Sequence, residues 1–180
     1  MSSDNPEIRE FYNNYQPPRY ALRTVKKLLY SVPAKYLDGL DCVVLTNQSG
    51  QPRRIRLGKV TSRKRRLPQS QVLGKYHPAG RAGQLPWIEL FVDNLAAGTD
   101  ASGHGWLPFI RYACFGLVLF HEIGHHIHAT ITPEHREKED VADDWGKKLL
   151  RSFIRRKYWY LAPIRKPLGR FLKEWSKSLD

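Results

Sequence analysis

Two histidines and a glutamate stand at the spacing that binds and uses a divalent metal ion. His121 and His125 are four residues apart, so on a helix both imidazoles project from the same face. Two imidazoles in this arrangement can share one Zn²⁺. Glu122, next to the first histidine, is then placed to take a proton from a water on that metal. The pattern predicts a single catalytic Zn²⁺.

A long helix over residues 107–130 is expected to carry these side chains. The run from Leu107 to Phe120 is almost entirely apolar, which predicts a helix buried on most sides, and Pro108 suits its first turn. Unpaired polar groups are costly in such surroundings, and a metal shared by the two imidazoles removes that cost. A glycine inside a helix costs about 1 kcal/mol relative to alanine. Gly124 therefore predicts a close approach by another part of the chain.

A second helix brings acidic side chains to the same place. The Thr-Pro pair at 132–133 is a typical helix start, so the two helices are expected to form an antiparallel hairpin. At about 1.5 Å of rise per residue, His125 lies ~7.5 Å before the turn and Glu139 ~9 Å after it. On the same scale His121 lies ~13.5 Å before the turn and Asp143 ~15 Å after it. Glu139 is therefore predicted as the third metal ligand. Asp143 is predicted to accept the other ring N–H of His121 and so to orient that imidazole.

Three further histidines near the motif remain as alternatives. His128, seven residues after His121, lies nearly on the metal-binding face and is an alternative third ligand, although a hydrogen-bonded or substrate-facing role fits it better. His135, early in the second helix, could lie over the cleft or replace Glu139. His126 points away from the metal-binding face and is expected to be structural or solvated.

The two motifs together resemble those of a known peptidase family. The HExxH pattern at 121–125, followed by ExxxD at 139–143, is similar to the signature of gluzincin metallopeptidases, and the small size resembles the minigluzincins and the ImmA/IrrE-like peptidases of bacteria. The resemblance covers residues 87–150, and the chain departs from larger members in the short segment between its motifs. It implies a zincin-like fold and a zinc-dependent peptidase, with Glu122 activating the attacking water.

The resemblance also implies the surroundings of the reaction. A strand over 87–94 would form the upper edge of the cleft and pair with an extended peptide substrate. The residues assigned to that substrate edge are Trp87, Glu89 and Phe91. A histidine or tyrosine would stabilise the oxyanion; His135 is placed among the catalytic residues, and the other candidates are His104, His77, Tyr76 and Tyr112.

The whole chain predicts one α+β domain over residues 1–180. An amphipathic helix over 19–30 precedes about four short strands, and helices follow, which favours a small, mostly antiparallel sheet packed on the active-site hairpin. The expected strands are 41–46, 54–60, 71–76 and 87–94, with a loop over 96–105. The parts of the domain are a loosely held segment over 1–18, a helix and sheet over 19–94, the helical hairpin over 107–160 and a basic amphipathic helix over 163–180.

Composition favours a soluble, cytoplasmic protein. The chain has 180 residues and is 41% hydrophobic, which suits one globular core. Residues 1–10 lack the apolar stretch of a signal peptide, and no apolar run is long enough to span a membrane. Cys42 and Cys114 lie in apolar stretches and are expected to be buried free thiols.

The net charge of +13 favours contact with polyanions. Much of it lies in one stretch, with Arg53, Arg54, Arg56, Arg63, Lys64, Arg65 and Arg66. This stretch is either a solvated hairpin edge or a surface that binds nucleic acid or another anionic partner. The helix over 163–180 either lies on an anionic membrane, contacts a partner or packs on the core. The rival to a peptidase is therefore a DNA-associated or regulatory binding protein on a zincin scaffold.

Overall fold

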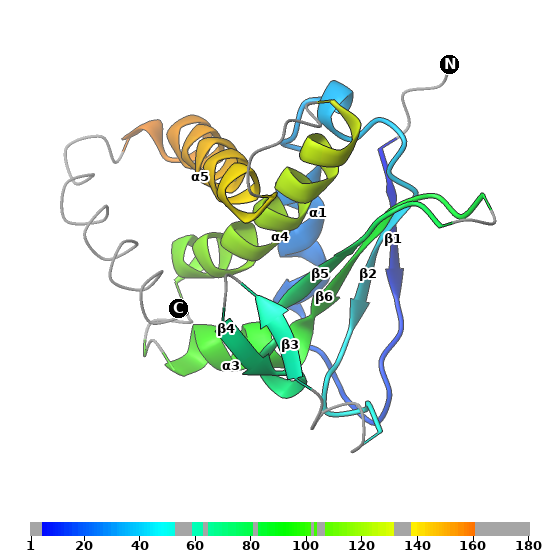
Figure 1. Cartoon of the computed structure of the whole chain (residues 1–180). Helices are drawn as coiled ribbons and strands as arrows, with labels where there is room; N and C mark the ends of the chain where they lie inside the picture. The colour runs from blue at the N-terminus through cyan, green and yellow to red at the C-terminus, as the bar shows by residue number, and fades with distance from the viewer. Residues whose placement is uncertain are drawn as a thin grey trace.

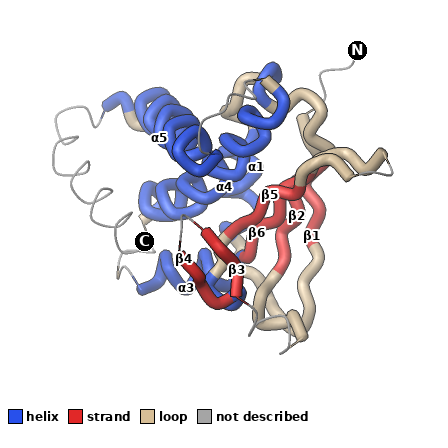
Figure 2. The backbone as a smooth tube through the Cα atoms, viewed as in Figure 1, coloured by secondary structure: helices blue, strands red, loops and turns tan. Residues whose placement is uncertain are grey.

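The computed structural model describes residues 5–52, 59–62, 65–80, 83–101, 103, 107–131 and 138–160. Its elements, in chain order, are β1 (Glu7–Glu10), α1 (Tyr20–Leu29), η1 (Ala34–Tyr36), β2 (Cys42–Thr46), β3 (Lys59–Ser62), β4 (Arg65–Pro68), η2 (Gln69–Gln71), β5 (Gly74–His77), β6 (Trp87–Phe91), α3 (Val92–Ala101), α4 (Pro108–Thr130) and α5 (Lys138–Lys157). The predicted α+β class is confirmed. The helices α1, α4 and α5 lie together on one side of a sheet (Figures 1 and 2).

The sheet has four strands in the order β1-β2-β6-β5, and β3 and β4 form a separate antiparallel hairpin. The strands β1, β2 and β6 are parallel, and only β5 runs antiparallel to its neighbour β6. The expectation of a mostly antiparallel sheet is therefore wrong. Its cause is the connectivity: α1 links β1 to the parallel β2, and β6 enters the sheet between β2 and β5.

Two segments expected to be irregular are regular. Residues 7–10, placed in the loosely held lead-in, form β1 and pair with β2 from Glu7↔Cys42 to Glu10↔Leu45. This strand carries three charged residues, a composition typical of a sheet edge, and so it resembles a polar tail in sequence. The predicted strand 87–94 ends at Phe91, and α3 then runs to Ala101 through most of the expected loop. Its buried side chains recur at helical spacing: Val92, Leu95, Ala96 and Thr99.

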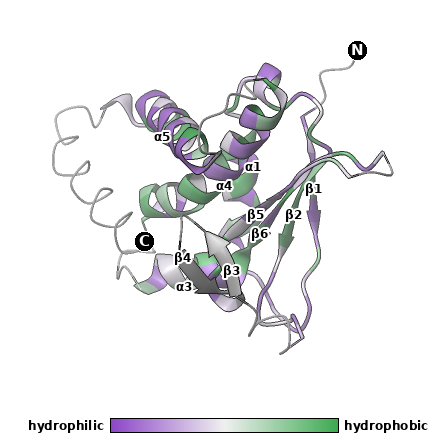
Figure 3. Cartoon of the chain, viewed as in Figure 1, coloured by the Kyte–Doolittle hydropathy of each residue, from purple (hydrophilic) through white to green (hydrophobic). Residues whose placement is uncertain are grey.

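The core lies between the sheet and helices α1 and α4. Val43 and Leu45 of β2 stand beside Ile88 and Leu90 of β6, and all four side chains are fully buried. They pack in one cluster with the apolar face of α4, which includes Phe115, Leu119, Ile123 and Ile127. The apolar N-terminal half of α4 is visible in Figure 3, where α5 is largely hydrophilic on its outer side. α4 begins at Pro108, as predicted.

Two glycines allow α4 and α5 to pack with their backbones close together. A Cβ on Gly124 would lie 2.5 Å from the carbonyl oxygen of Ala142, and a Cβ on Gly146 would lie 3.2 Å from the Cα of His121. The prediction of a close approach at Gly124 is confirmed, and α5 is the approaching element. This contact brings the acidic residues of α5 next to the histidines of α4.

The remaining expectations meet the structure as follows. Cys42 and Cys114 are both buried and free. None of the helices in the described ranges combines the length and hydropathy that a membrane span needs. The predicted helix start at 132–133, the helix over 163–180 and the basic residues at 53, 54, 56, 63 and 64 lie outside the described residues, whereas Arg65 and Arg66 lie in β4.

Candidate metal centre

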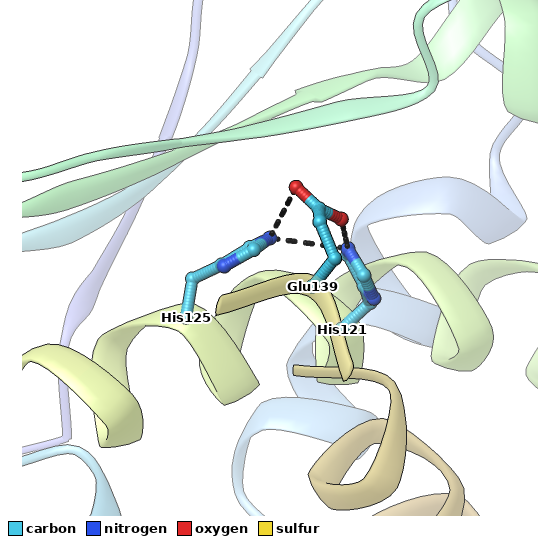
Figure 4. Close-up of side chains that lie close together, drawn as sticks. All are labelled: His121, His125 and Glu139. Atoms are coloured by element: carbon cyan, nitrogen blue, oxygen red, sulfur yellow. Dashed lines mark hydrogen bonds and ion pairs between the residues drawn. The ribbon is translucent and has the colours of Figure 1, made fainter. Parts of the chain in front are cut away.

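The three predicted ligands converge. His121 and His125 project from α4, and Glu139 reaches them from the first turn of α5 (Figure 4). The two Nε2 atoms are 3.1 Å apart. Glu139 Oε2 is 3.4 Å from Nε2 of His121, and Oε1 is 3.8 Å from Nε2 of His125. Among the described residues these three form the group that could hold a metal ion.

Asp143 orients one of the imidazoles. Its Oδ1 lies 2.8 Å from Nδ1 of His121, one helical turn after Glu139. A neutral His121 with its proton on Nδ1 donates it to Asp143 and directs the Nε2 lone pair at the other ligands. The predicted contact between Asp143 and His121 is therefore present. Glu139, expected level with His125, instead lies between the two histidines and nearer to His121.

The two imidazoles hold their protons with unequal strength. Burial lowers the pKa of each. At His121 the hydrogen bonds to Asp143 and Glu139 outweigh burial and raise the pKa to about 9. At His125 burial and the neighbouring charge of His121 lower the pKa to about 4. Near neutral pH the pair therefore carries one positive charge, on His121, whose two ring nitrogens are both protonated. The Nε2–H of His121 can then donate to Nε2 of His125.

Glu122 lies under the antiparallel strand β5. Its side chain is buried, with 7% exposed. A Cβ on Gly74 of β5 would lie 3.2 Å from Glu122 Oε1 and 2.6 Å from Val118 Cγ1. The missing side chain of Gly74 lets the strand lie directly against α4 at the carboxylate. An isolated glycine inside a strand is a sequence signal for such an approach, and Gly74 is a site residue that the sequence reasoning missed.

The substrate-edge assignment to β6 is wrong. β6 is an inner strand, paired with β2 on one side and β5 on the other, so its backbone groups serve the sheet. Trp87, Glu89 and Phe91 also alternate with Ile88 and Leu90, whose side chains enter the core beneath the helices. They therefore lie on the opposite face from α4. Within the described residues, β5 is the edge strand beside the candidate metal centre.

His126 is buried and bonded, as one of its two expected roles required. Its side chain is 0% exposed, and Nε2 lies 3.0 Å from the carbonyl oxygen of Asp38. Its Nδ1 lies 3.4 Å from the hydroxyl of Tyr76 on β5. The Tyr76 ring is also nearly parallel to the His125 ring, at 17° and 6.4 Å between centroids. Burial lowers the pKa of His126, against the hydrogen bond to the Asp38 carbonyl, and so favours the uncharged imidazole.

The other candidates separate by position. His128 is buried but is not in the ligand group, so the structure does not support it as the alternative ligand. His77 lies on the outer face of β5, where it contacts Glu89 at 3.0 Å and stacks on Trp87. Tyr112 packs against Phe153 and Tyr158, far along α4 from the ligands. The candidates His104 and His135 lie outside the described residues. Tyr76 is thus the candidate nearest the ligands in the described part of the chain.

No protein-family model matches this chain, and no curated protein or solved structure matches it at a significant level.

Proposed function

We propose that this chain is a zinc-dependent metallopeptidase of zincin-like fold, similar to the gluzincins. The observation that carries the proposal is the convergence of His121, His125 and Glu139 beside the buried carboxylate of Glu122. Ligand atoms about 2.0–2.2 Å from a tetrahedral zinc ion lie about 3.3–3.6 Å from one another. The two Nε2 atoms are 3.1 Å apart, and each lies 3.4 or 3.8 Å from one of the two carboxylate oxygens of Glu139, which is close to that spacing. Three protein ligands leave one position open, the arrangement of catalytic rather than structural zinc.

Each site residue has a separate task in peptide hydrolysis. When bound, zinc supplies a Lewis acid that polarises the scissile carbonyl and lowers the pKa of a coordinated water to about 7. Glu122 accepts the proton of the attacking water and returns it to the nitrogen of the leaving amine. Asp143 holds His121 with Nδ1 protonated, so that Nε2 is the nitrogen that gives up its proton and binds the metal. A purely structural zinc site would have no use for Glu122.

The free edge of β5 is the proposed substrate-binding strand. Phe91 N donates to Leu73 O across the β5–β6 register, so odd-numbered residues of this strand turn their backbone groups toward β6. Gly74 and Tyr76 consequently turn their N–H and C=O groups to the open edge. An extended peptide added there pairs with the strand that lies over Glu122. Burial of the peptide backbone in this pairing gives affinity without selecting particular side chains.

Replacement of the proposed general base tests the reaction. Glu122→Gln keeps the shape of the side chain and removes its basicity, so zinc content is expected to stay at one per chain while cleavage of a peptide library falls by about 100-fold or more. Glu10→Gln, on the far edge of the sheet, is the matched control and should cleave normally. Full peptidase activity in the zinc-loaded Glu122→Gln protein would remove this role from Glu122.

The ligand set has its own test. Glu139→Ala is expected to lose bound zinc when the metal is measured by atomic emission after gel filtration, because two imidazoles alone bind it weakly. Asp140→Asn, a change on the exposed side of the same helix turn, should keep it. Equal zinc content in both variants would exclude Glu139 as a ligand.

The charge of +13 supports one rival, a nucleic-acid-associated binding protein on the same scaffold. DNA affinity that falls steeply with salt, together with no cleavage in the peptide library, would favour the rival over the peptidase. DNA binding by a chain that also cleaves peptides would make the basic surface an accessory of the enzyme.

A further inference from the structure

We propose that Tyr76 and His126 are positioning residues. They join the edge strand β5 to α4, the helix of the two histidine ligands, and so fix the distance between β5 and His125. The inference rests on the proposed function, because it assigns a purpose to residues around the same site. Neither residue is a metal ligand in the group formed by His121, His125 and Glu139.

The hydrogen bonds define the state of the histidine. The carbonyl oxygen of Asp38 can only accept, so Nε2 of His126, 3.0 Å away, carries the proton and donates. A neutral imidazole with Nε2 protonated has an acceptor at Nδ1, and the hydroxyl of Tyr76 therefore donates to Nδ1 across 3.4 Å. The result is a directed chain from Tyr76 through His126 to the backbone at Asp38.

These two hydrogen bonds connect three separate parts of the fold. Tyr76 belongs to β5, His126 belongs to α4, and Asp38 lies in the turn after η1, next to Gly39 in a left-handed conformation (φ 77°). His126 is completely buried, so its ring cannot exchange these partners for bulk water. The anchor on one side is backbone, and the object held on the other is the edge strand.

The position of Tyr76 makes the connection relevant to the site. Its backbone N–H and C=O face the open edge of the sheet, while its ring lies nearly parallel to that of His125 and 5.8 Å from the His126 ring. A shift of Tyr76 would therefore move two things together. One is the strand edge that would pair with a peptide, and the other is the ring that lies nearly parallel to His125. A Cβ on Gly74, two residues earlier on the same face, would lie 3.2 Å from Glu122 Oε1, so the same strand segment also lies over the base.

Cobalt substitution tests the proposal through the metal rather than through cleavage alone. The full-length protein is loaded with Co²⁺, and the visible absorption band and the affinity against a competing chelator are measured for the wild type, Tyr76→Phe, His126→Gln and the double variant. His126→Gln retains a donor near the Nε2 position and removes the acceptor for Tyr76. Tyr112→Phe, at a buried tyrosine that packs far from the ligands, is the control.

The expected result is a shared effect of the two single changes. Tyr76→Phe and His126→Gln should each bind one Co²⁺, change the absorption band and lose about tenfold in metal affinity, the low end of the range for outer partners of metal ligands. The double variant should resemble each single variant, because all three lose the same hydrogen bond. If the wild type cleaves peptides, the kcat/KM values should fall in parallel with these changes.

An unchanged band and affinity in Tyr76→Phe would overturn the proposal. Effects that add in the double variant, or an equal change in Tyr112→Phe, would also overturn it. Loss of thermal stability with an unchanged cobalt spectrum would also assign the pair to packing alone. A wild type that binds Co²⁺ but cleaves no peptide would defeat the proposed function and leave the metal measurements valid, whereas a wild type that binds no Co²⁺ would defeat both.

Discussion

At the scale of single residues, the site consists of paired groups whose protonation states are set by their partners. Asp143 keeps a proton on Nδ1 of His121, and the carbonyl of Asp38 keeps one on Nε2 of His126. The adjacent histidines 125 and 126 thus have different roles, although their sequence context is almost the same. A neighbouring carboxylate or carbonyl, rather than the motif itself, decides which nitrogen of each ring is available.

Metal binding should release about one proton near pH 7. His121 holds a proton up to a pKa of about 9, and His125 loses its own above a pKa of about 4, so between these values one proton must leave before both imidazoles can be ligands. The apparent zinc affinity should therefore rise about tenfold per pH unit across this window and level off above it. Calorimetric titration in two buffers of different ionisation enthalpy measures the proton count, and a count of zero at pH 7 would contradict the prediction.

At the scale of elements, the contact between α4 and α5 builds the site. Gly124 and Gly146 let the two backbones meet, and the meeting places Glu139 and Asp143 against the histidines. A side chain at either glycine would meet the backbone of the other helix and push the two helices apart. It would disturb the candidate ligands through this separation rather than by direct contact. The arrangement of the candidate ligands therefore depends directly on how closely α4 and α5 pack.

Gly124→Ala is expected to destabilise the fold. The new methyl would lie 2.5 Å from the carbonyl oxygen of Ala142, and backbone atoms cannot move aside as a flexible side chain can. Overpacking of this kind costs about 1–3 kcal/mol and the gain in helix propensity is about 1 kcal/mol, so the free energy of unfolding should fall by up to about 2 kcal/mol.

The control for this change is Gly98→Ala in α3. Beyond the local helix backbone, no atom of the described residues lies within 4 Å of a Cβ at this position, so the helix propensity dominates and stability should rise by up to about 1 kcal/mol. Urea denaturation of both variants gives the comparison. Equal stability changes at the two glycines would show that α5 does not press on Gly124.

Strand addition at β5 predicts a period of two in the substrate. In a peptide that the protein cleaves, N-methylation of every second residue should lower kcat/KM by about tenfold or more, because those N–H groups would pair with the edge at Gly74 and Tyr76. N-methylation of the residues between them should have little effect. A methylation profile without alternation would exclude β5 as the pairing strand.

How far the elements follow from the sequence depends on how local their causes are. α4 and β2 were predictable because their own apolar residues specify them, and the hairpin depth argument found Glu139 and Asp143 from helical rise alone. The order of the strands was not predictable in this way. β6 pairs with β2 and β5 through contacts between distant segments, and a central strand and an edge strand have similar local patterns.

The site shows the same division. The ligands are a local pattern on two helices, whereas the roles of Tyr76 and Asp38 depend on three elements that meet only in the fold. The assignment of the substrate edge to β6 failed for this reason. The assignment rested on β6, which has the clearest strand pattern in the sequence. β6 is an inner strand of the sheet and so has no free edge.

At the scale of the whole molecule, a bound metal would connect α4 to α5 across the six residues between 131 and 138 in sequence. Such a link stabilises only the folded chain, because the unfolded chain does not bring the three ligands together. Removal of the metal should therefore lower the stability of the domain, independently of the proposed peptidase activity.

Thermal unfolding with and without a chelator measures this coupling. At free zinc about 1,000 times its Kd, binding should add about 4 kcal/mol to the free energy of unfolding. For a chain of this size, that corresponds to a rise in Tm on the order of 10 °C. Glu139→Ala should show a much smaller chelator effect than the wild type. Identical melting curves for the wild type under both conditions would contradict metal binding by the folded state.

The order of the strands also has a consequence for the nascent chain. β6 is the last of the four strands to be synthesised, yet it sits between β2 and β5. Until Phe91 has left the ribosome, the apolar face of β2 lacks its central neighbour and β5 lacks a partner altogether in this sheet. The sheet can therefore be completed only once Phe91 has emerged, about halfway along the 180-residue chain, and α4 and α5, which carry the candidate metal ligands, emerge only afterwards. The apolar side chains of β2 that form the core of the finished domain thus lack their central neighbours until about half of the chain has been synthesised.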